Sequence, residues 1–108
     1  MARYLFIQSQ DPFTEVRVHA QFDLARRLVA AGNQVRLLLV QNGVSAARRG
    51  ARCEAFDALP GHGVGLLADE FALQQREIDT AQLKTEIAVA GVDMVIDAML
   101  AGDKVIWN

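Results

Sequence analysis

The sequence predicts an α/β fold, a three-layer α/β/α sandwich built on a five-stranded, mainly parallel sheet. Short unbroken apolar runs recur along the chain and alternate with segments of helical periodicity. Unbroken apolar runs are typical of parallel strands covered on both faces, whereas alternation of apolar and polar residues is typical of strands with one solvent-exposed face. Strands alternating with helices indicate βαβ units. With 108 residues and no internal repeat or linker, residues 1–108 are expected to form a single domain.

Five segments carry the strand pattern, and the fourth of them carries it most weakly. They are Tyr4–Ile7, Val35–Val40, Val64–Ala68, Ile87–Ala90 and Lys104–Trp107. The first two runs are the most apolar, so we expect them to be adjacent central strands of the sheet.

The first helix is expected to open at Asp11-Pro12 and to end near Ala31, before Gly32-Asn33. Aspartate accepts from the free N–H groups of a helix start, proline fits the first turn, and glycine ends a helix. At about 100° per residue, two apolar stripes along this helix point in different directions. They are Val18, Phe22, Ala25 and Val29, and Val16, Ala20, Leu24 and Leu28. One stripe suffices to cover the sheet, so the second predicts self-association.

Three shorter helices are expected further along the chain. They are Cys53–Leu59, which Pro60-Gly61 ends, Phe71–Arg76, and a segment after Asp93 with Met94, Val95, Ala98 and Met99 on its apolar side. Ile78–Glu86 fits either a helix or a loop.

A ligand-binding crevice is expected at the carboxyl ends of the strands, where sites form in open parallel sheets. Its candidate residues are Ser9, Asp11, Asn42, Gly43, Asp69 and Glu70. The first loop precedes a helix N-terminus, which either holds an anion or is simply capped. The adjacent carboxylates of Asp69 and Glu70 either act on a ligand or cap the following helix.

Cys53 is the only cysteine and the candidate catalytic residue. The neighbouring Arg49 and Arg52 and a helix N-terminus are surroundings that favour a reactive thiolate, the alternative being an incidental buried thiol. His19 and His62 have no metal-ligand spacing with it, and no glycine-rich phosphate motif is present. Neither a metal nor a cofactor is therefore expected.

Composition excludes several classes of function. A net charge of −2 and a pI near 5.6 argue against nucleic-acid binding. The apolar runs are shorter than the roughly 20 residues that span a bilayer, no secretory leader is evident, and a lone cysteine fits a reducing compartment. We therefore expect a cytoplasmic protein. The basic cluster Arg48, Arg49 and Arg52 is either a solvated loop or a contact for an anionic partner.

In order and spacing, these pieces resemble the DsrE/DsrF-like family of small α/β proteins related to bacterial sulfur-relay subunits. The resemblance covers nearly the whole chain. Its best matches are Asp11-Pro12, Gly32–Val35, Gln41–Val44, Arg76–Ile78 and Ala101–Ile106.

The resemblance implies a persulfide-carrying cysteine just after the third strand of catalytic members. Here that position falls at or beside Asp69, within Leu66–Phe71, which contains no sulfur. The resemblance thus implies an accessory or non-catalytic subunit of intracellular sulfur relay or sulfur oxidation. The alternative is a small-molecule or anion-binding oligomer without transfer activity. The family resemblance further implies a homo-trimer or hexamer, with other sulfur-relay proteins as partners.

Overall fold

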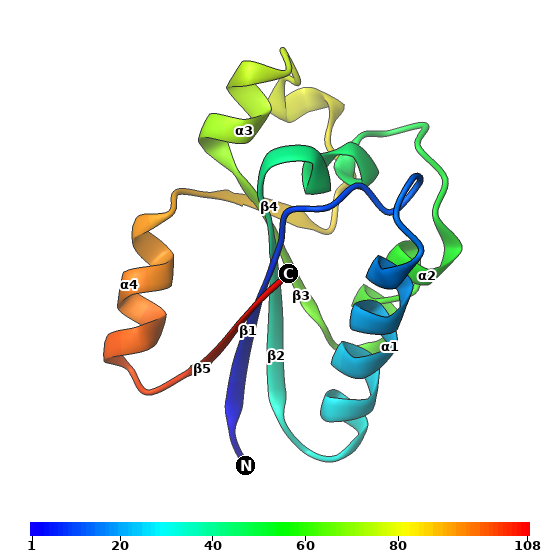
Figure 1. Ribbon diagram of the computed structural model, residues 1–108. Coiled ribbons are helices and arrows are strands. Elements are labelled where there is room, and N and C mark those ends of the chain that lie inside the picture. The colour runs from blue at the N-terminus through cyan, green and yellow to red at the C-terminus, as the bar shows by residue number, and fades with distance from the viewer.

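An all-parallel sheet of five strands, in the order β4-β3-β2-β1-β5, forms the middle layer of the computed structural model, which describes residues 1–108 (Figure 1). The strands are β1 (Arg3–Gln8), β2 (Gln34–Leu39), β3 (Gly65–Asp69), β4 (Ile87–Ala90) and β5 (Lys104–Trp107). The predicted five-stranded parallel sheet is therefore confirmed. Its first two strands are adjacent and both lie inside the sheet, as predicted.

Helices cover both faces of the sheet. Helices α1 (Arg17–Ala30) and α2 (Glu54–Asp57) lie on one face, α4 (Asp93–Leu100) lies on the other, and α3 (Glu70–Gln75) stands at the carboxyl edge (Figure 1). The connections include three 3₁₀ segments, η1 (Gln41–Ala47), η2 (Pro60–His62) and η3 (Thr80–Gln82). None of the helices combines the length and the apolar composition that crossing a bilayer requires.

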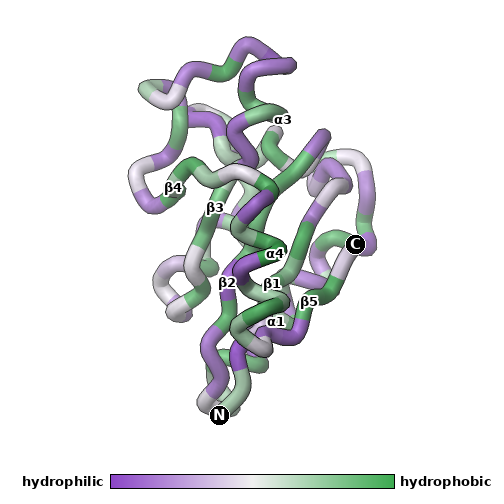
Figure 2. Tube along the Cα trace, turned by 90° about the vertical axis from the view of Figure 1, so that its left-hand side faces the viewer, coloured by the Kyte–Doolittle hydropathy of each residue, from purple (hydrophilic) through white to green (hydrophobic).

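The two faces of the sheet are filled unequally. Successive strand residues point to opposite faces, so Phe6 packs toward α1 while Leu5 and Ile7 pack toward α4. The core on the α1 face contains 21 buried residues, whereas the core on the α4 face contains only five. Figure 2 looks onto the thinner side, with α4 in front of the sheet. Much apolar surface near α4 is left uncovered as a result.

Helix α1 begins at Arg17, so the predicted start at Asp11-Pro12 is wrong. The Asp11 carboxylate instead accepts a hydrogen bond from the backbone N–H of Phe13 (2.8 Å), which closes a local turn. Such a side-chain turn competes with a helix start. The predicted end is confirmed, because the helix stops at Ala30 and Gly32 adopts the left-handed conformation that suits glycine (φ 94°).

The shorter helices follow their sequence signals to different degrees. Helix α4 occupies the predicted segment and α3 matches its prediction within one residue at each end. Helix α2 is shorter than predicted, since it ends at Asp57, and Ala58 and Leu59 separate it from Pro60, where η2 begins. The ambiguous segment Ile78–Glu86 is mainly loop, with η3 inside it and a short bridge from Leu83 to Arg48.

The second apolar stripe of α1 is only partly free. Leu28 is half-buried against the core, whereas Val16, Ala20 and Leu24 are exposed. The surface that this stripe offers for self-association is therefore smaller than the sequence pattern indicated.

Candidate functional site

The carboxyl edge of the sheet carries the predicted site residues, but their polar atoms are engaged by different segments. Ser9 follows β1, and both its backbone N–H and its hydroxyl donate to the carbonyl oxygen of Asn108, at 2.8 and 2.9 Å. Ser9 thereby fastens the end of β5 to the end of β1. Its hydroxyl oxygen can still accept a hydrogen bond, but its proton is used within the protein.

Asp11 and Gly43 join the first loop to η1. The Asp11 carboxylate accepts from the hydroxyl of Ser45 at 2.9 Å, in addition to the N–H of Phe13. Gly43 lies so close to β1 that an added Cβ would stand 2.2 Å from the carbonyl oxygen of Gln8. Only glycine fits this approach without movement of the backbone. Both residues therefore stabilise the contact between the first loop, η1 and the end of β1.

Asn42 points toward the end of α3 instead of toward Ser9 or Asp11. Its side-chain oxygen accepts a hydrogen bond of 2.8 Å from the guanidinium of Arg76. This contact ties η1 to the residue that follows α3. The sequence did not indicate the pairing, because the two residues are 34 positions apart.

Asp69 ends β3 and caps α3, as the sequence pattern indicated. Its carboxylate accepts from the backbone N–H of Ala72 at 3.0 Å, and the residue is only 5% exposed. Glu70 stands in the first turn of the same helix and is exposed. The two neighbouring carboxylates therefore do not converge on one point. A negative charge at a helix start is favourable, because the unpaired N–H groups there carry partial positive charge.

An apolar groove opens beside Asp69, between α3, α4 and the sheet. Its volume is about 490 Å³. Ten of its 13 lining residues are hydrophobic, and they include Ile7, Leu38, Val40, Phe71, Val92, Val95, Ile96, Met99 and Trp107. Asp69 is the only ionisable residue in the lining, with Gln41 and Gln75 as the other polar members. This groove is the candidate functional site, because a mainly apolar hollow with few polar groups is typical of ligand and partner sites.

Several side chains in this groove are unusually exposed for their type. Phe71, Val92, Ile96, Met99 and Trp107 each leave more than half of their surface open. Scattered apolar side chains are normal on a protein surface, but a contiguous group around one groove marks a surface for association. Met99 belongs to the side of its helix that the sequence pattern predicts to be apolar, and the thin cover of this sheet face leaves it exposed.

Cys53 lies far from this groove in the architecture. It precedes α2, is 6% exposed, and packs in the large core on the α1 face together with Ala68. Asp69 lines the groove on the α4 face with Leu38 and Val40. The sheet therefore separates the Cys53 thiol from the Asp69 carboxylate, and the two do not share a cleft.

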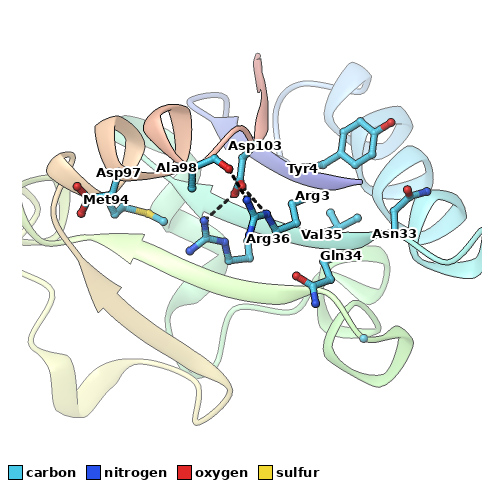
Figure 3. A pocket seen from close by; sticks show the side chains of 12 residues that line it. Arg3, Tyr4, Asn33, Gln34, Val35, Arg36, Met94, Asp97, Ala98 and Asp103 are labelled. Atoms are coloured by element: carbon cyan, nitrogen blue, oxygen red, sulfur yellow. Dashed lines mark hydrogen bonds and ion pairs between the residues drawn. The ribbon is translucent and has the colours of Figure 1, made fainter. Parts of the chain in front are cut away.

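A second hollow, of about 660 Å³, lies at the amino edge of the sheet (Figure 3). Its charged centre is Asp103, whose side chain is 4% exposed and stands 2.8 Å from Arg3 and 3.1 Å from Arg36. Both guanidinium groups point at this carboxylate in Figure 3. No spacing in the sequence links the three residues. The ion pairs hold β1, β2 and the turn before β5 together, which is a structural role.

The carboxyl-edge groove contains no group that could accept sulfur. Its polar side chains are the Asp69 carboxylate, which caps α3, and the amides of Gln41 and Gln75. Its one sulfur atom is the thioether of Met99, and it contains no thiol. A thiolate is required to accept sulfur as a persulfide, because only sulfur forms the sulfur–sulfur bond.

Comparison with known proteins agrees with this architecture. The model of the DsrE/DsrF-like family matches residues 2–107. Among solved structures, the protein of unknown function MTH1491 from Methanobacterium thermoautotrophicum is 23% identical, with both chains fully covered and a TM-score of 0.86. The ychN protein from E. coli is 19% identical, again with full coverage of both chains, and has a TM-score of 0.87. At these identities the likeness shows the fold alone. No curated protein matches the sequence significantly.

Proposed function

Because the chain belongs to the DsrE/DsrF-like family, we propose that it serves an intracellular sulfur relay or sulfur-oxidation system as a non-catalytic, accessory subunit. One observation carries the proposal. The place where the family resemblance puts the persulfide cysteine falls at or beside Asp69, the last residue of β3, and the Asp69 carboxylate caps the start of α3. The groove beside Asp69 offers an apolar surface for a partner or ligand, but it contains no thiol sulfur that could react.

The chemistry of sulfur transfer supports this reading. In a transfer step, an acceptor thiolate attacks the outer sulfur of a donor persulfide, a new sulfur–sulfur bond forms, and the donor leaves as a thiolate. A carboxylate forms no such bond. Cys53 is the one alternative acceptor, and its burial on the α1 face keeps it away from the groove. We therefore expect transfer to be weak or absent, and we place the protein in the reducing cytoplasm, where a lone cysteine stays unpaired.

We further propose that the chain associates with copies of itself as a trimer or hexamer, and that other sulfur-relay proteins are its remaining partners. The apolar groove supports this proposal better than the stripe on α1. Five exposed apolar side chains gather around the groove, whereas the α1 stripe offers exposed Val16 and Leu24 beside the half-buried Leu28. The groove side also has the thinner core, so burial of its apolar surface there would stabilise an assembly.

A second candidate function is the binding of a small, mainly apolar molecule without any sulfur transfer. The observation that favours it is the size and lining of the groove, about 490 Å³ with Asp69 as the single charge. Such a volume lies within the range of small-molecule sites. Saturable binding of a small apolar probe, together with a complete lack of contact with sulfur-relay proteins, would favour this alternative.

Persulfide loading followed by intact mass spectrometry tests the main proposal. The native chain is incubated with a persulfide donor, beside the variants Cys53→Ser and Asp69→Cys. We expect no gain for the native chain or for Cys53→Ser, and a gain of about 32 Da for Asp69→Cys, whose new thiol stands at a helix start beside the groove. Stoichiometric loading of the native chain that Cys53→Ser abolishes would contradict the non-catalytic assignment.

A further inference from the structure

Three arginines from two distant segments line one hollow at the carboxyl edge. Arg48 and Arg49 follow η1, and Arg76 follows α3. They line a hollow of about 370 Å³ with Glu77, Ile78, Ala81 and Gln82. We propose that Arg48, Arg49 and Arg76 form a binding site for a tetrahedral oxyanion with two negative charges, either a free inorganic anion such as phosphate or the phosphate group of a small monoester.

The three guanidinium groups share one property, which is the lack of a carboxylate partner. Of the nine arginines in the chain, five form ion pairs: Arg3, Arg17, Arg26, Arg27 and Arg36. Of the four that form none, three line this hollow, and the fourth is Arg52. Unneutralised arginines are thus gathered here and not spread evenly over the surface. Mutual repulsion opposes such a gathering, and an anion would relieve it.

Neutral oxygens hold two of the arginines in place. Arg49 donates from Nε to the carbonyl oxygen of Leu83 at 2.9 Å. Arg76 donates to the carbonyl oxygen of Ala72 at 3.2 Å and to the side-chain oxygen of Asn42 at 2.8 Å. These contacts position both guanidinium groups without neutralising their charge. A positioned side chain loses less conformational freedom on binding a ligand, which favours affinity.

The backbone around the hollow is also tied together. The N–H of Arg49 donates to the carbonyl oxygen of Gln82 at 2.7 Å, and the N–H of Lys84 donates to that of Ala47 at 2.9 Å. The N–H of Ile78 donates to the carbonyl oxygen of Leu73 at 2.9 Å. The segment after η1 and the loop after α3 are therefore fixed relative to each other. The backbone positions of the three arginines are therefore fixed relative to one another.

Donor count and charge indicate the kind of ligand. Arginine has five N–H donors in a planar fork that matches two oxygens of a phosphate-like group. The hydrogen bonds described above use one donor of Arg49 and two of Arg76, and none is formed by the Arg48 side chain. Against three positive charges, the lining contains one carboxylate, that of Glu77. The surplus of two positive charges suits a dianion better than a monoanion.

Titration with phosphate at constant, low ionic strength tests the proposal. The native protein is titrated with inorganic phosphate and, in a separate arm, with glycerol phosphate, while amide chemical shifts are followed by NMR. We expect saturable shifts around Arg48, Arg49, Arg76 and Gln82, with a Kd of about 1 mM or tighter. Tighter binding of the monoester would identify a phosphorylated molecule as the ligand class, and equal binding would identify the free anion.

Matched variants separate a built site from general attraction to positive charge. Arg48→Gln removes a side chain without internal hydrogen bonds, so folding should be unaffected, and we expect affinity to fall by about five- to tenfold. Glu77→Gln should raise affinity by about two- to fivefold. Arg27→Gln, an ion-paired arginine on α1, should change nothing. Shifts that do not saturate, or an equal effect of Arg48→Gln and Arg27→Gln, would overturn the proposal. Its test involves no sulfur chemistry, so it stands or fails independently of the proposed function.

Discussion

The Cys53 thiol and the Asp69 carboxylate lie on opposite faces of the parallel sheet. Cys53 packs in the core under α1, and Asp69 borders the groove beneath α4. A sulfur atom bound to Cys53 could not reach the groove without disruption of the core between them. The only thiol of the chain therefore lies away from the position where the family resemblance puts the persulfide cysteine. This separation supports the non-catalytic assignment, which rests on the carboxylate at that position.

Asp69 should contribute to stability through its role as the cap of α3. Asp69→Ala removes the acceptor of the Ala72 N–H, so we expect the free energy of unfolding to fall by about 1 kcal/mol. Asp69→Asn keeps an acceptor and should lose less. Urea unfolding monitored by circular dichroism measures both. The control is Glu70→Ala, an exposed neighbour for which a change within about 0.5 kcal/mol is expected. Equal losses for Ala at both positions would contradict the capping role.

Gly43 should tolerate no side chain. In Gly43→Ala the new Cβ would stand 2.2 Å from the carbonyl oxygen of Gln8, so the backbone must shift. We expect a loss of about 3 kcal/mol in the free energy of unfolding, as for an overpacked core position. Gly61→Ala is the matched control, because a Cβ there meets nothing within 4 Å. If thermal melts show the same midpoint for both variants, the close approach of η1 to β1 is not rigid in solution.

Asp103 should be the most important carboxylate for stability. Asp103→Ala breaks the contacts to Arg3 and Arg36 around a nearly buried side chain, and we expect a loss of about 2 kcal/mol. The Arg3 contact is close but poorly aligned as a hydrogen bond, and the arginines can still reach water, so the loss stays below that of a fully buried pair.

Asp23→Ala serves as the control for Asp103, because Asp23 pairs with Arg26 and Arg27 on an open helix surface. The hydrogen bond from Arg26 lowers the pKa of Asp23 below its ordinary value. Its contribution is therefore present above that ordinary pKa and is lost as the pH falls through the lowered one, so both variants are compared at neutral pH. A larger loss for Asp23→Ala than for Asp103→Ala in denaturant titrations would refute the ranking.

Self-association should depend on the α4 side of the molecule more than on α1. Ile96→Glu places a charge in the exposed apolar patch beside the groove, and we expect it to convert a trimer or hexamer to monomers. Leu24→Glu changes the apolar stripe of α1 and should have a smaller effect. Sedimentation equilibrium at micromolar concentration measures both. A native chain that sediments as a monomer would refute self-association, and dissociation by Leu24→Glu alone would assign the interface to α1.

The sequence by itself determined the features that depend on neighbours along the chain. Unbroken apolar runs specified the five strands and the burial of the three inner ones, β1, β2 and β3, whereas the edge strands β4 and β5 stay largely open. Helical periodicity identified Val18, Phe22 and Ala25 as the buried face of α1, and capping of the following helix was one of the two roles that the sequence offered for Asp69. These signals are reliable because each rests on hydrogen bonds or packing within a few residues.

Only the tertiary structure decided which distant groups meet. The strand order placed Asp69 beside α4 and left Cys53 under α1, and the path of the loop after α3 brought Arg76, not Arg52, to Arg48 and Arg49. The tertiary structure also places the Asp11 carboxylate against the Ser45 hydroxyl and not at the start of α1. Loop paths follow from the packing of the whole core, in which many small contacts between remote segments add up. No short window of sequence contains that sum, so the site had to be read from the fold.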